Sequence, residues 1–209
     1  ALELDPNLVE AYKERARTFL ELKEYVRAVN DLNSAEEVDP ADEEIYFLRG
    51  EAQYHRRMFD AAVADFSRAL EPMHEDPKLL YDRGLVYLRQ SEFRKAFEDL
   101  DRACKLNPDS ARALSMRGVA RFFLQDLDQS IVDLEKSASM NPHDPIILNN
   151  RGFFYLKMGN YGAAKSDFQK AMQIDPKFMD AKQNLKLVQS RQLQEKLAIK
   201  DAYTEQGSK

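Results

Sequence analysis

The chain has 209 residues, of which 44% are hydrophobic and 32% charged, and its formal net charge at pH 7 is −5. It holds no apolar run long enough to span a bilayer and no basic stripe interleaved with aromatic residues, which excludes membrane insertion and disfavours a nucleic-acid binder. The single cysteine, Cys104, has no internal disulfide partner, so a reducing, cytoplasmic compartment is expected.

The pair Arg-Gly recurs along the chain at a fixed interval of 34 residues. Its four copies are Arg49-Gly50, Arg83-Gly84, Arg117-Gly118 and Arg151-Gly152. A period of this size indicates stacked copies of one supersecondary unit, because a single copy cannot bury its apolar face alone. The interval therefore predicts a repeat architecture, and a binding surface in place of a catalytic pocket.

In chain order, the period divides the sequence into five repeats with a segment at each end. Residues 1–6 match the end of a preceding repeat, so we expect the chain to be part of a longer array. The five repeats are expected at 7–40, 41–74, 75–108, 109–142 and 143–176. A capping helix is predicted over 177–200 and a flexible tail over 201–209.

Each repeat is predicted to contain two helices, A and B, because small and large residues return at spacings of three and four. Helix A is expected near 9–22, 43–56, 77–90, 111–124 and 145–158. Helix B is expected near 25–38, 59–71, 93–106, 127–139 and 161–174. Proline ends most B helices. After the second B helix His74 stands in its place and Pro72 and Pro77 flank it, so that helix is expected to end a turn early.

This pattern resembles the tetratricopeptide repeat family over about residues 7–176. The family's large residue at position 4 is matched by Tyr12, Tyr46, Leu80, Leu114 and Leu148. Its small residue at position 8 is matched by Ala16, Gly50, Gly84, Gly118 and Gly152. The resemblance implies an all-α, right-handed superhelical solenoid of about five repeats, whose concave face binds peptides or partner domains.

Two repeats depart from the family pattern at position 11, where an aromatic residue is usual. Gln53 and Arg121 stand there in the second and fourth repeats. A polar group at this position must find a partner or remain wet, so these repeats are expected to be locally looser.

The resemblance also places the candidate binding site, because helix A lines the concave face of the family at positions 2, 5, 6, 9, 12 and 13. It implies a groove that is charged in the first repeat and apolar beyond it. The candidate partner-binding residues are Lys13, Arg17, Phe47, Leu48, Tyr81, Leu85, Met116, Val119, Phe122 and Phe153. The alternative is that neighbouring repeats partly cover these side chains.

Chaperone-binding members of the family grip a C-terminal carboxylate with Lys, Asn and Arg at set positions. The equivalent positions here read Lys13, Arg17, Leu48, Lys78 and Asp82. Asp82 would repel the carboxylate that it should hold, so chaperone binding through this clamp is disfavoured.

Two charges also follow the period, an Arg at position 7 and an Asp at position 23. The arginines are Arg15, Arg49, Arg83, Arg117 and Arg151, and the aspartates are Asp31, Asp65, Asp99, Asp133 and Asp167. The arginines could form an anion-binding ladder. Framework ion pairs are favoured instead, because a partly buried guanidinium needs a carboxylate.

No residue pattern points to catalysis. The three histidines, His55, His74 and His143, have no second ligand at helical spacing, so neither a metal nor a cofactor is expected. The chain has no glycine-rich phosphate-binding loop, and we expect no enzymatic activity.

The sequence thus predicts a non-enzymatic scaffold that holds a protein or peptide partner, as an amphipathic helix or an extended apolar segment, in the groove. The alternative is a structural assembly element that self-associates or packs permanently into a larger complex. Oligomers at micromolar concentration would distinguish the second from the first. An RNA-reading repeat protein is a third reading, and its longer period and basic groove are missing.

Overall fold

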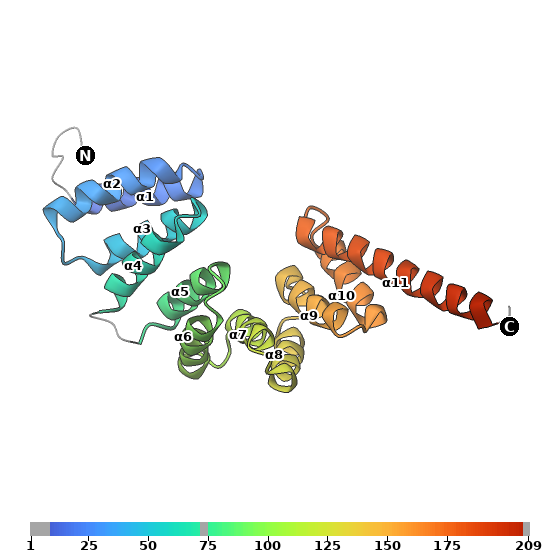
Figure 1. The fold of residues 1–209 in the computed structure, drawn as a ribbon. Coiled ribbons are helices and arrows are strands. Elements are labelled where there is room, and N and C mark those ends of the chain that lie inside the picture. The colour runs from blue at the N-terminus through green and yellow to red at the C-terminus, as the bar shows by residue number, and fades with distance from the viewer. Residues whose placement is uncertain (1–8, 72–74, 207–209) are drawn as a thin grey trace. The chain divides into compact units, whose positions relative to one another are not determined.

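The computed structural model describes residues 9–71 and 75–206, and every regular element within these ranges is an α-helix (Figure 1). The all-α fold class is therefore confirmed. The helices are α1 (Val9–Glu21), α2 (Tyr25–Val38), α3 (Glu43–His55), α4 (Phe59–Leu70), α5 (Pro77–Arg89), α6 (Phe93–Leu106), α7 (Ala111–Phe123), α8 (Leu127–Met140), α9 (Pro145–Lys157), α10 (Tyr161–Ile174) and α11 (Met179–Gln206). They fall into one compact unit, residues 1–120, and a second, residues 121–209.

The ten repeat helices begin and end within one residue of the predicted bounds. Helix α4 has 12 residues where α2 has 14, in agreement with the early end expected for it. The terminal helix differs from the prediction, because α11 continues to Gln206 and so enters the segment expected to be a flexible tail. The expected end of a preceding repeat, residues 1–6, lies outside the described residues, as does His74.

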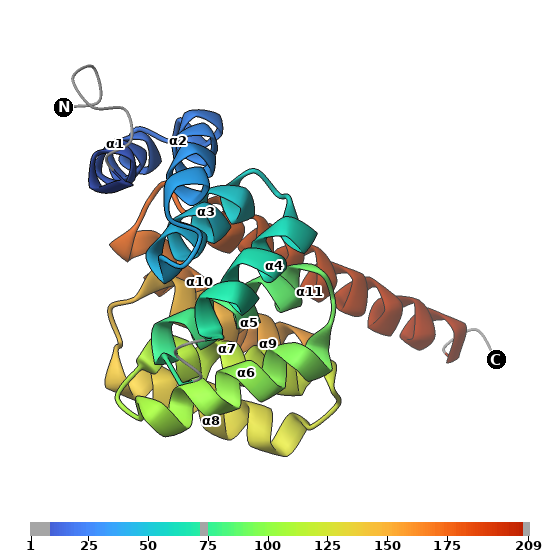
Figure 2. The same cartoon turned by 90° about the vertical axis from the view of Figure 1, so that its left-hand side faces the viewer.

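The two helices of a repeat lie side by side, as Figures 1 and 2 both show for α5 with α6 in the first unit and for α9 with α10 in the second. Glycine permits this close approach. A Cβ atom on Gly50 would lie 2.8 Å from the Phe66 ring, and one on Gly152 would lie 2.8 Å from the Phe168 ring. The small residue at position 8 therefore makes room for the bulky residue on helix B.

Several A helices begin with the same cap. The side chains of Asp42, Asp76 and Asp144 accept hydrogen bonds from backbone N–H groups in the first turns of α3, α5 and α9. Pro77 and Pro145 occupy the first turn of their helices, where the missing N–H would have no helical partner. These signals fix where the helices start.

The turn between helices A and B repeats one backbone conformation. Residues Lys23, Arg57, Ser91, Gln125 and Gly159 all have positive φ, between 61° and 77°. In the first turn the N–H of Glu24 donates to the carbonyl of Phe19 at 2.8 Å, which closes the end of α1. The left-handed residue thus reverses the chain in each repeat, although glycine occupies it in only one of these five turns.

The predicted framework ion pairs are confirmed in four repeats. Both carboxylate oxygens of the Asp accept hydrogen bonds from the guanidinium at 2.6–2.9 Å in the pairs Arg15–Asp31, Arg49–Asp65, Arg83–Asp99 and Arg151–Asp167. Each pair joins helix A to helix B of its own repeat.

The two polar residues at position 11 meet different surroundings. In the second unit Nη1 of Arg121 donates to Asp133 at 2.7 Å, so its charge has a carboxylate partner. In the first unit Oε1 of Gln53 is buried, and no described residue donates a hydrogen bond to it. Nε of Arg121 is also buried without a hydrogen bond to a described residue, so each of the two positions leaves one buried polar atom unsatisfied.

Helix α11 covers the last repeat of the second unit. Its residues Ala181 and Val188 are fully buried and pack in one cluster with Leu156, Ala164 and Phe168. This helix also donates a hydrogen bond from Nδ2 of Asn184 to the neighbouring helix α9. The first half of α11 is therefore an integral part of the core.

Candidate functional site

The candidate site is the set of side chains at positions 2, 5, 6, 9, 12 and 13 of the A helices, which we name the A-helix face. In the first unit it lies on α1, α3, α5 and most of α7. In the second unit it lies on the end of α7 and on α9. Of the predicted site residues, Phe122 and Phe153 belong to the second unit and the others to the first.

At the charged end of this face Lys13 is buried. Its side-chain ammonium donates to Asp42 at 2.7 Å and to Glu44 at 3.0 Å, and it lies 2.8 Å from Glu10. Burial alone would lower the pKa of Lys13, but the hydrogen bonds to the three carboxylates raise it above its usual range. The ammonium therefore stays charged and is satisfied within the chain.

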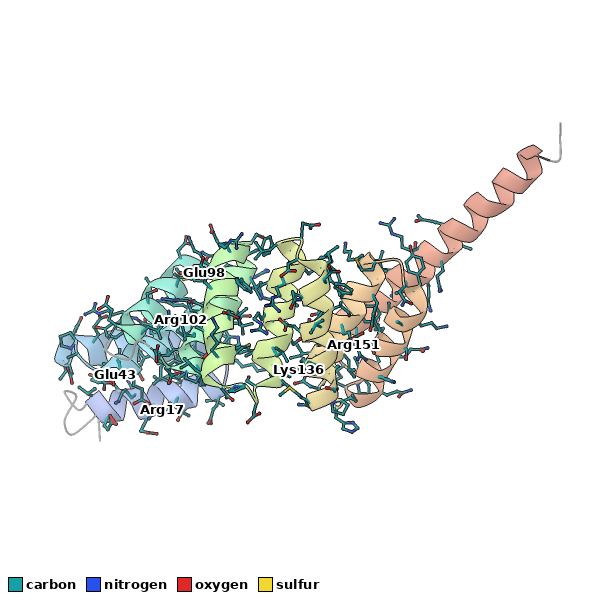
Figure 3. The ribbon with its side chains drawn as sticks, turned by 90° about the horizontal axis from the view of Figure 1, so that it is seen from below. Arg17, Glu43, Glu98, Arg102, Lys136 and Arg151 are labelled. Carbon is teal, nitrogen blue, oxygen red and sulfur yellow. The ribbon has the colours of Figure 1, made fainter. Side chains whose placement is uncertain are left out.

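Arg17 extends from α1, the same helix that carries Lys13 (Figure 3). Its guanidinium donates to Glu14 on its own helix and to Glu44 on α3. The hydrogen bond to Glu44 raises the pKa of Arg17, and Glu44 thus links the cations Lys13 and Arg17. Neither cation is offered freely to a partner's carboxylate.

The apolar residues of the first unit differ in how much surface they present. Leu48 is 5% exposed and packs in the core cluster of α2 and α3, so a partner could touch little of it. Tyr81 and Leu85 on α5 are half-buried, as are Met116 and Val119 on α7. These four side chains keep surface that a partner can cover.

Phe47 contacts Lys78, whose place in the sequence pattern is only that of a carboxylate-clamp position. Nζ of Lys78 lies 3.7 Å from the centre of the Phe47 ring and 3.7 Å from Oδ2 of Asp82. Burial raises the pKa of Asp82 to about 6, with Lys78 opposing the shift and Glu51 adding to it. The sequence indicates the ion pair between Lys78 and Asp82, because these residues are four positions apart and share a helix face.

In the second unit the structure brings the two predicted residues into contact. The Phe122 ring lies 6.0 Å from Phe153 and 5.3 Å from Phe123, with near-perpendicular planes. Nζ of Lys157 lies 5.1 Å from the centre of the Phe153 ring. Phe123 is 41% exposed, so this aromatic cluster reaches the surface.

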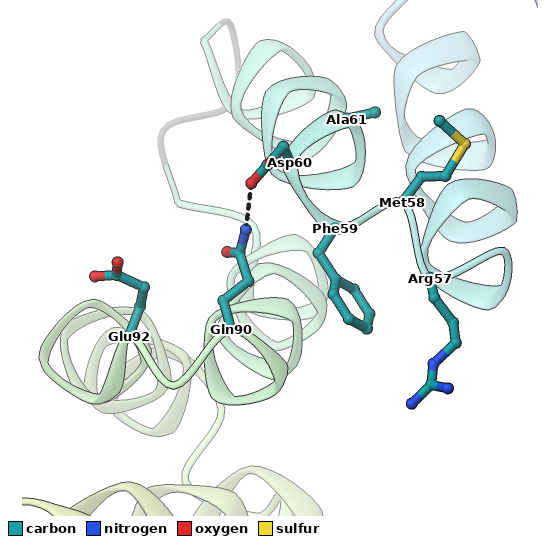
Figure 4. Close-up of a pocket in the computed structure, with 7 residues that line it drawn as sticks. All are labelled: Arg57, Met58, Phe59, Asp60, Ala61, Gln90 and Glu92. Carbon is teal, nitrogen blue, oxygen red and sulfur yellow. Dashed lines mark hydrogen bonds between the residues drawn. The ribbon is translucent and has the colours of Figure 1, made fainter.

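A separate hollow of about 580 Å³ lies at the A–B turns of the second and third repeats (Figure 4). Its lining includes Phe59 and Met58, and Nε2 of Gln90 donates to Oδ1 of Asp60 across it at 2.6 Å. These residues lie on turns and helix starts and are not part of the A-helix face.

The described residues form neither a metal site nor a membrane span. No three side chains among their His, Cys, Asp and Glu residues gather closely enough to hold a metal ion. None of their helices combines the length and apolar content needed to cross a membrane.

Solved structures show where this architecture occurs. The structure of YrrB, described as a TPR protein with an unusual peptide-binding site, is 24% identical with a TM-score of 0.67, covering 89% of this chain and 96% of YrrB. TTC0263 of Thermus thermophilus, a thermophilic TPR protein, is 18% identical with a TM-score of 0.72. The match covers 86% of this chain and 98% of TTC0263. The APC/C hetero-tetramer Cut9–Hcn1 is 20% identical with a TM-score of 0.76, covering 90% of this chain but 37% of the matched one. These likenesses support the solenoid fold.

Family models give the more direct comparison. No curated protein sequence matches the chain. A tetratricopeptide repeat model matches residues 2–78 and 81–145, and another matches residues 145–178. The matches take in far more than half of the sequence and agree with the helix pairs, the glycine contacts and the solved folds. The chain belongs to the tetratricopeptide repeat family.

Proposed function

We propose that this chain is a non-enzymatic scaffold that holds a partner polypeptide against its A-helix face. Proteins of the tetratricopeptide repeat family generally bind protein or peptide partners, and catalysis is not their usual role. The observation that carries the proposal is that each unit has half-buried apolar side chains at the positions of this face. Tyr81 and Leu85 are examples in the first unit, and Phe122 and Phe153 are examples in the second.

The partner segment is an amphipathic helix or an extended apolar strand. Apolar anchors that return every three or four residues would meet side chains one helical turn apart, such as Tyr81 and Leu85. Covering such surface contributes roughly 25 cal/mol per Å² before ordering costs. Two or three anchors therefore suffice for a specific but reversible complex.

Other partner classes fit this face less well. The carboxylate clamp of chaperone-binding members is disfavoured, because Lys13 already holds three carboxylates and Asp82 occupies another clamp position. The proposal includes no cofactor, nucleic acid or membrane insertion. The cytoplasmic location remains a prediction from the single Cys104.

Self-association is the second candidate, and it has its own observation. Val26 on α2 is 57% exposed and Val132 on α8 is 53% exposed, so the B helices also present apolar surface. An assembly element would use such surface to join copies of the chain. It predicts oligomers at micromolar concentration in analytical ultracentrifugation, where the scaffold proposal predicts a monomer.

The test is a matched pair of surface changes in each unit, made in the full-length protein. Leu85→Asp and Phe153→Asp place a charge on the A-helix face, whereas Val26→Asp and Val132→Asp place one on B helices. Crosslinking mass spectrometry in the native cells first identifies the partner, and its affinity is then measured against each variant. We expect the A-helix variants to lose at least tenfold in affinity, about 1.4 kcal/mol, and the B-helix variants to keep it. The opposite result would place recognition on the B helices.

A further inference from the structure

We propose that the A-helix face of the first unit selects a partner segment in which a lysine or arginine stands between apolar residues, with its cationic group received by Phe47, Glu51 and Asp82. This inference rests on the proposed scaffold function and adds the chemistry of the partner. We name the three side chains the cation niche.

The chain's own Lys78 shows that the cation niche accepts an ammonium group. Its Nζ lies over the face of the Phe47 ring at 3.7 Å from the ring centre, within the range of a cation–π interaction. The same atom lies 3.7 Å from Oδ2 of Asp82, as an ion pair without close hydrogen-bond geometry. The Lys78 side chain is 67% exposed, so a partner's cation can displace it at little cost.

The cation niche holds more negative charge than Lys78 neutralises. Glu51 has no ion-pair partner among the described residues. The ammonium group of Lys78 is the cation that pairs with Asp82, and it also contacts the Phe47 ring. The Asp82 side chain is 25% exposed, which weakens the compensation that water gives it. Burial, together with Glu51 and Asp76, raises the pKa of this carboxyl to about 6 in spite of Lys78. A second cation would stabilise its ionised form.

The two cations of the A-helix face on α1 are held by other carboxylates. Lys13 is held by Asp42, Glu44 and Glu10, and Arg17 is likewise held by Glu44. An acidic partner segment would meet two carboxylates at the niche, which disfavours it. Charge complementarity therefore selects a basic residue.

Apolar surface beside the niche completes the recognition. Tyr81 and Leu85 are half-buried on α5, on the same helix as Asp82. Tyr81 at position 5 and Leu85 at position 9 lie one helical turn apart. Apolar residues that flank the partner's cation can therefore contact these two side chains. The combined pattern is a cation flanked by apolar anchors.

The probes are three fluorescein-labelled helical peptides with the same leucine ladder and a single central Lys, Gln or Glu. Their affinities for the 209-residue chain are measured by fluorescence anisotropy at pH 7.5. We expect the Lys peptide to bind about tenfold more tightly than the Gln peptide, and the Glu peptide to bind most weakly. The double variant Glu51→Gln with Asp82→Asn should bring the Lys peptide to the Gln level and leave the Gln peptide unchanged. Lys78→Met should strengthen Lys-peptide binding several-fold, because the competing ammonium is gone.

The matched control removes two carboxylates elsewhere in the first unit. Glu71→Gln with Glu98→Gln changes the net charge equally, and both positions are exposed on or beside B helices. The preference for Lys should survive this change. A preference lost equally in both double variants would show a general electrostatic effect and overturn the inference. Helical circular dichroism confirms that each variant is folded.

The two proposals fail in different ways. If all three peptides bind equally and Leu85→Asp abolishes binding, the scaffold proposal stands and the cation niche is wrong. If no peptide binds, or if Leu85→Asp leaves binding unchanged, the A-helix face of the first unit does not recognise the partner. Both proposals are then wrong for the first unit.

Discussion

At Gly50 the chain brings two helices so close that an added methyl group would lie 2.8 Å from the Phe66 ring. The first repeat solves the same packing problem with a different pair of residues. Ala16 stands at the equivalent position and Leu32 faces it from helix B, and both are fully buried in one cluster. The side-chain volumes on the two helices are therefore matched within each repeat.

Replacing Gly50 by Ala should lower the free energy of unfolding by about 1–3 kcal/mol, because the rigid Phe66 ring cannot move away without disturbing its neighbours. Adding Phe66→Leu reproduces the Ala–Leu pair of the first repeat and should recover part of the loss. Urea denaturation followed by circular dichroism measures both. Gly162→Ala is the control, since that exposed helical position has no heavy atom closer than 3.9 Å and should gain stability. Equal effects at Gly50 and Gly162 would contradict the packing account.

Asp82 gives a second prediction at this scale, in which stability depends on pH. Its pKa is raised from 3.8 to about 6 by burial, and the nearby charged groups are Lys78, Glu51 and Asp76. Because the folded state holds this proton more tightly, ionisation of Asp82 costs the wild-type protein stability as pH rises from about 4 to above 6.

Asp82→Asn removes that cost. The variant should match the wild type near pH 4 and exceed it by on the order of 1–3 kcal/mol at pH 7, as measured by denaturant melts across this range. A stability difference that does not change with pH would show that Asp82 titrates normally.

Between elements, the ion pair of each repeat crosses from helix A to helix B. In the third repeat Arg83 donates to both oxygens of Asp99, at 2.7 and 2.8 Å, and the Asp99 side chain is 6% exposed. Breaking such a pair leaves a buried charge without its partner, whereas removing both charges does not. Its contribution is therefore best measured with two variants.

Arg83→Met alone should cost about 3–5 kcal/mol, and Arg83→Met with Asp99→Leu should cost less than the single change. Thermal melts of both variants give the comparison. Partner affinity measured well below the melting transition should stay unchanged, because neither residue is on the A-helix face. Equal stability combined with lost binding would instead make the arginines a binding ladder.

The helix starts and ends could be predicted because their signals are local. Asp76 followed by Pro77 marks a start in the sequence, and the structure places the α5 cap there. The left-handed turns gave no such signal, because Lys23, Arg57 and Ser91 adopt positive φ without being glycine. Tertiary packing on both sides of the turn overrides their local preference.

The candidate site was less predictable than the fold for a related reason. Lys13 is neutralised by Asp42 and Glu44, which lie 29 and 31 residues away in the sequence. Those contacts depend on how α1 and α3 stack, and no single-helix pattern contains that information. Leu48 is a similar case, since its burial follows from the neighbouring repeat.

At the scale of the whole molecule, a stack of repeats must end on a surface that tolerates water. The first half of α11 provides this surface, with Ala181 and Val188 buried against the last repeat. Truncation after Pro176 would expose Ala171 and the half-buried Met172, which pack in the same cluster.

The truncated chain should therefore melt earlier and aggregate, as thermal melts and light scattering would show. Val188→Asp should reproduce the loss in the intact chain, because it places a charge in the same contact. Leu193→Ser should not, since Leu193 is 59% exposed. A truncated protein that stays monomeric and equally stable would make the segment an interaction tail in place of a cap.

The pairing of Arg and Asp within one repeat also bears on how such chains grow and shrink in evolution. In four repeats the guanidinium and its carboxylate are 16 residues apart and lie inside the same 34-residue copy. A gene duplication or deletion that adds or removes a whole copy therefore carries both charges of this pair together, and ion pairs to the preceding copy, such as Arg49–Glu36 and Arg117–Asp101, change at the junction. Had each arginine depended on the next copy, every such event would have stranded a buried charge at the new junction. The internal pair therefore lets copy number vary while the most buried carboxylate of each of these four repeats keeps its cation.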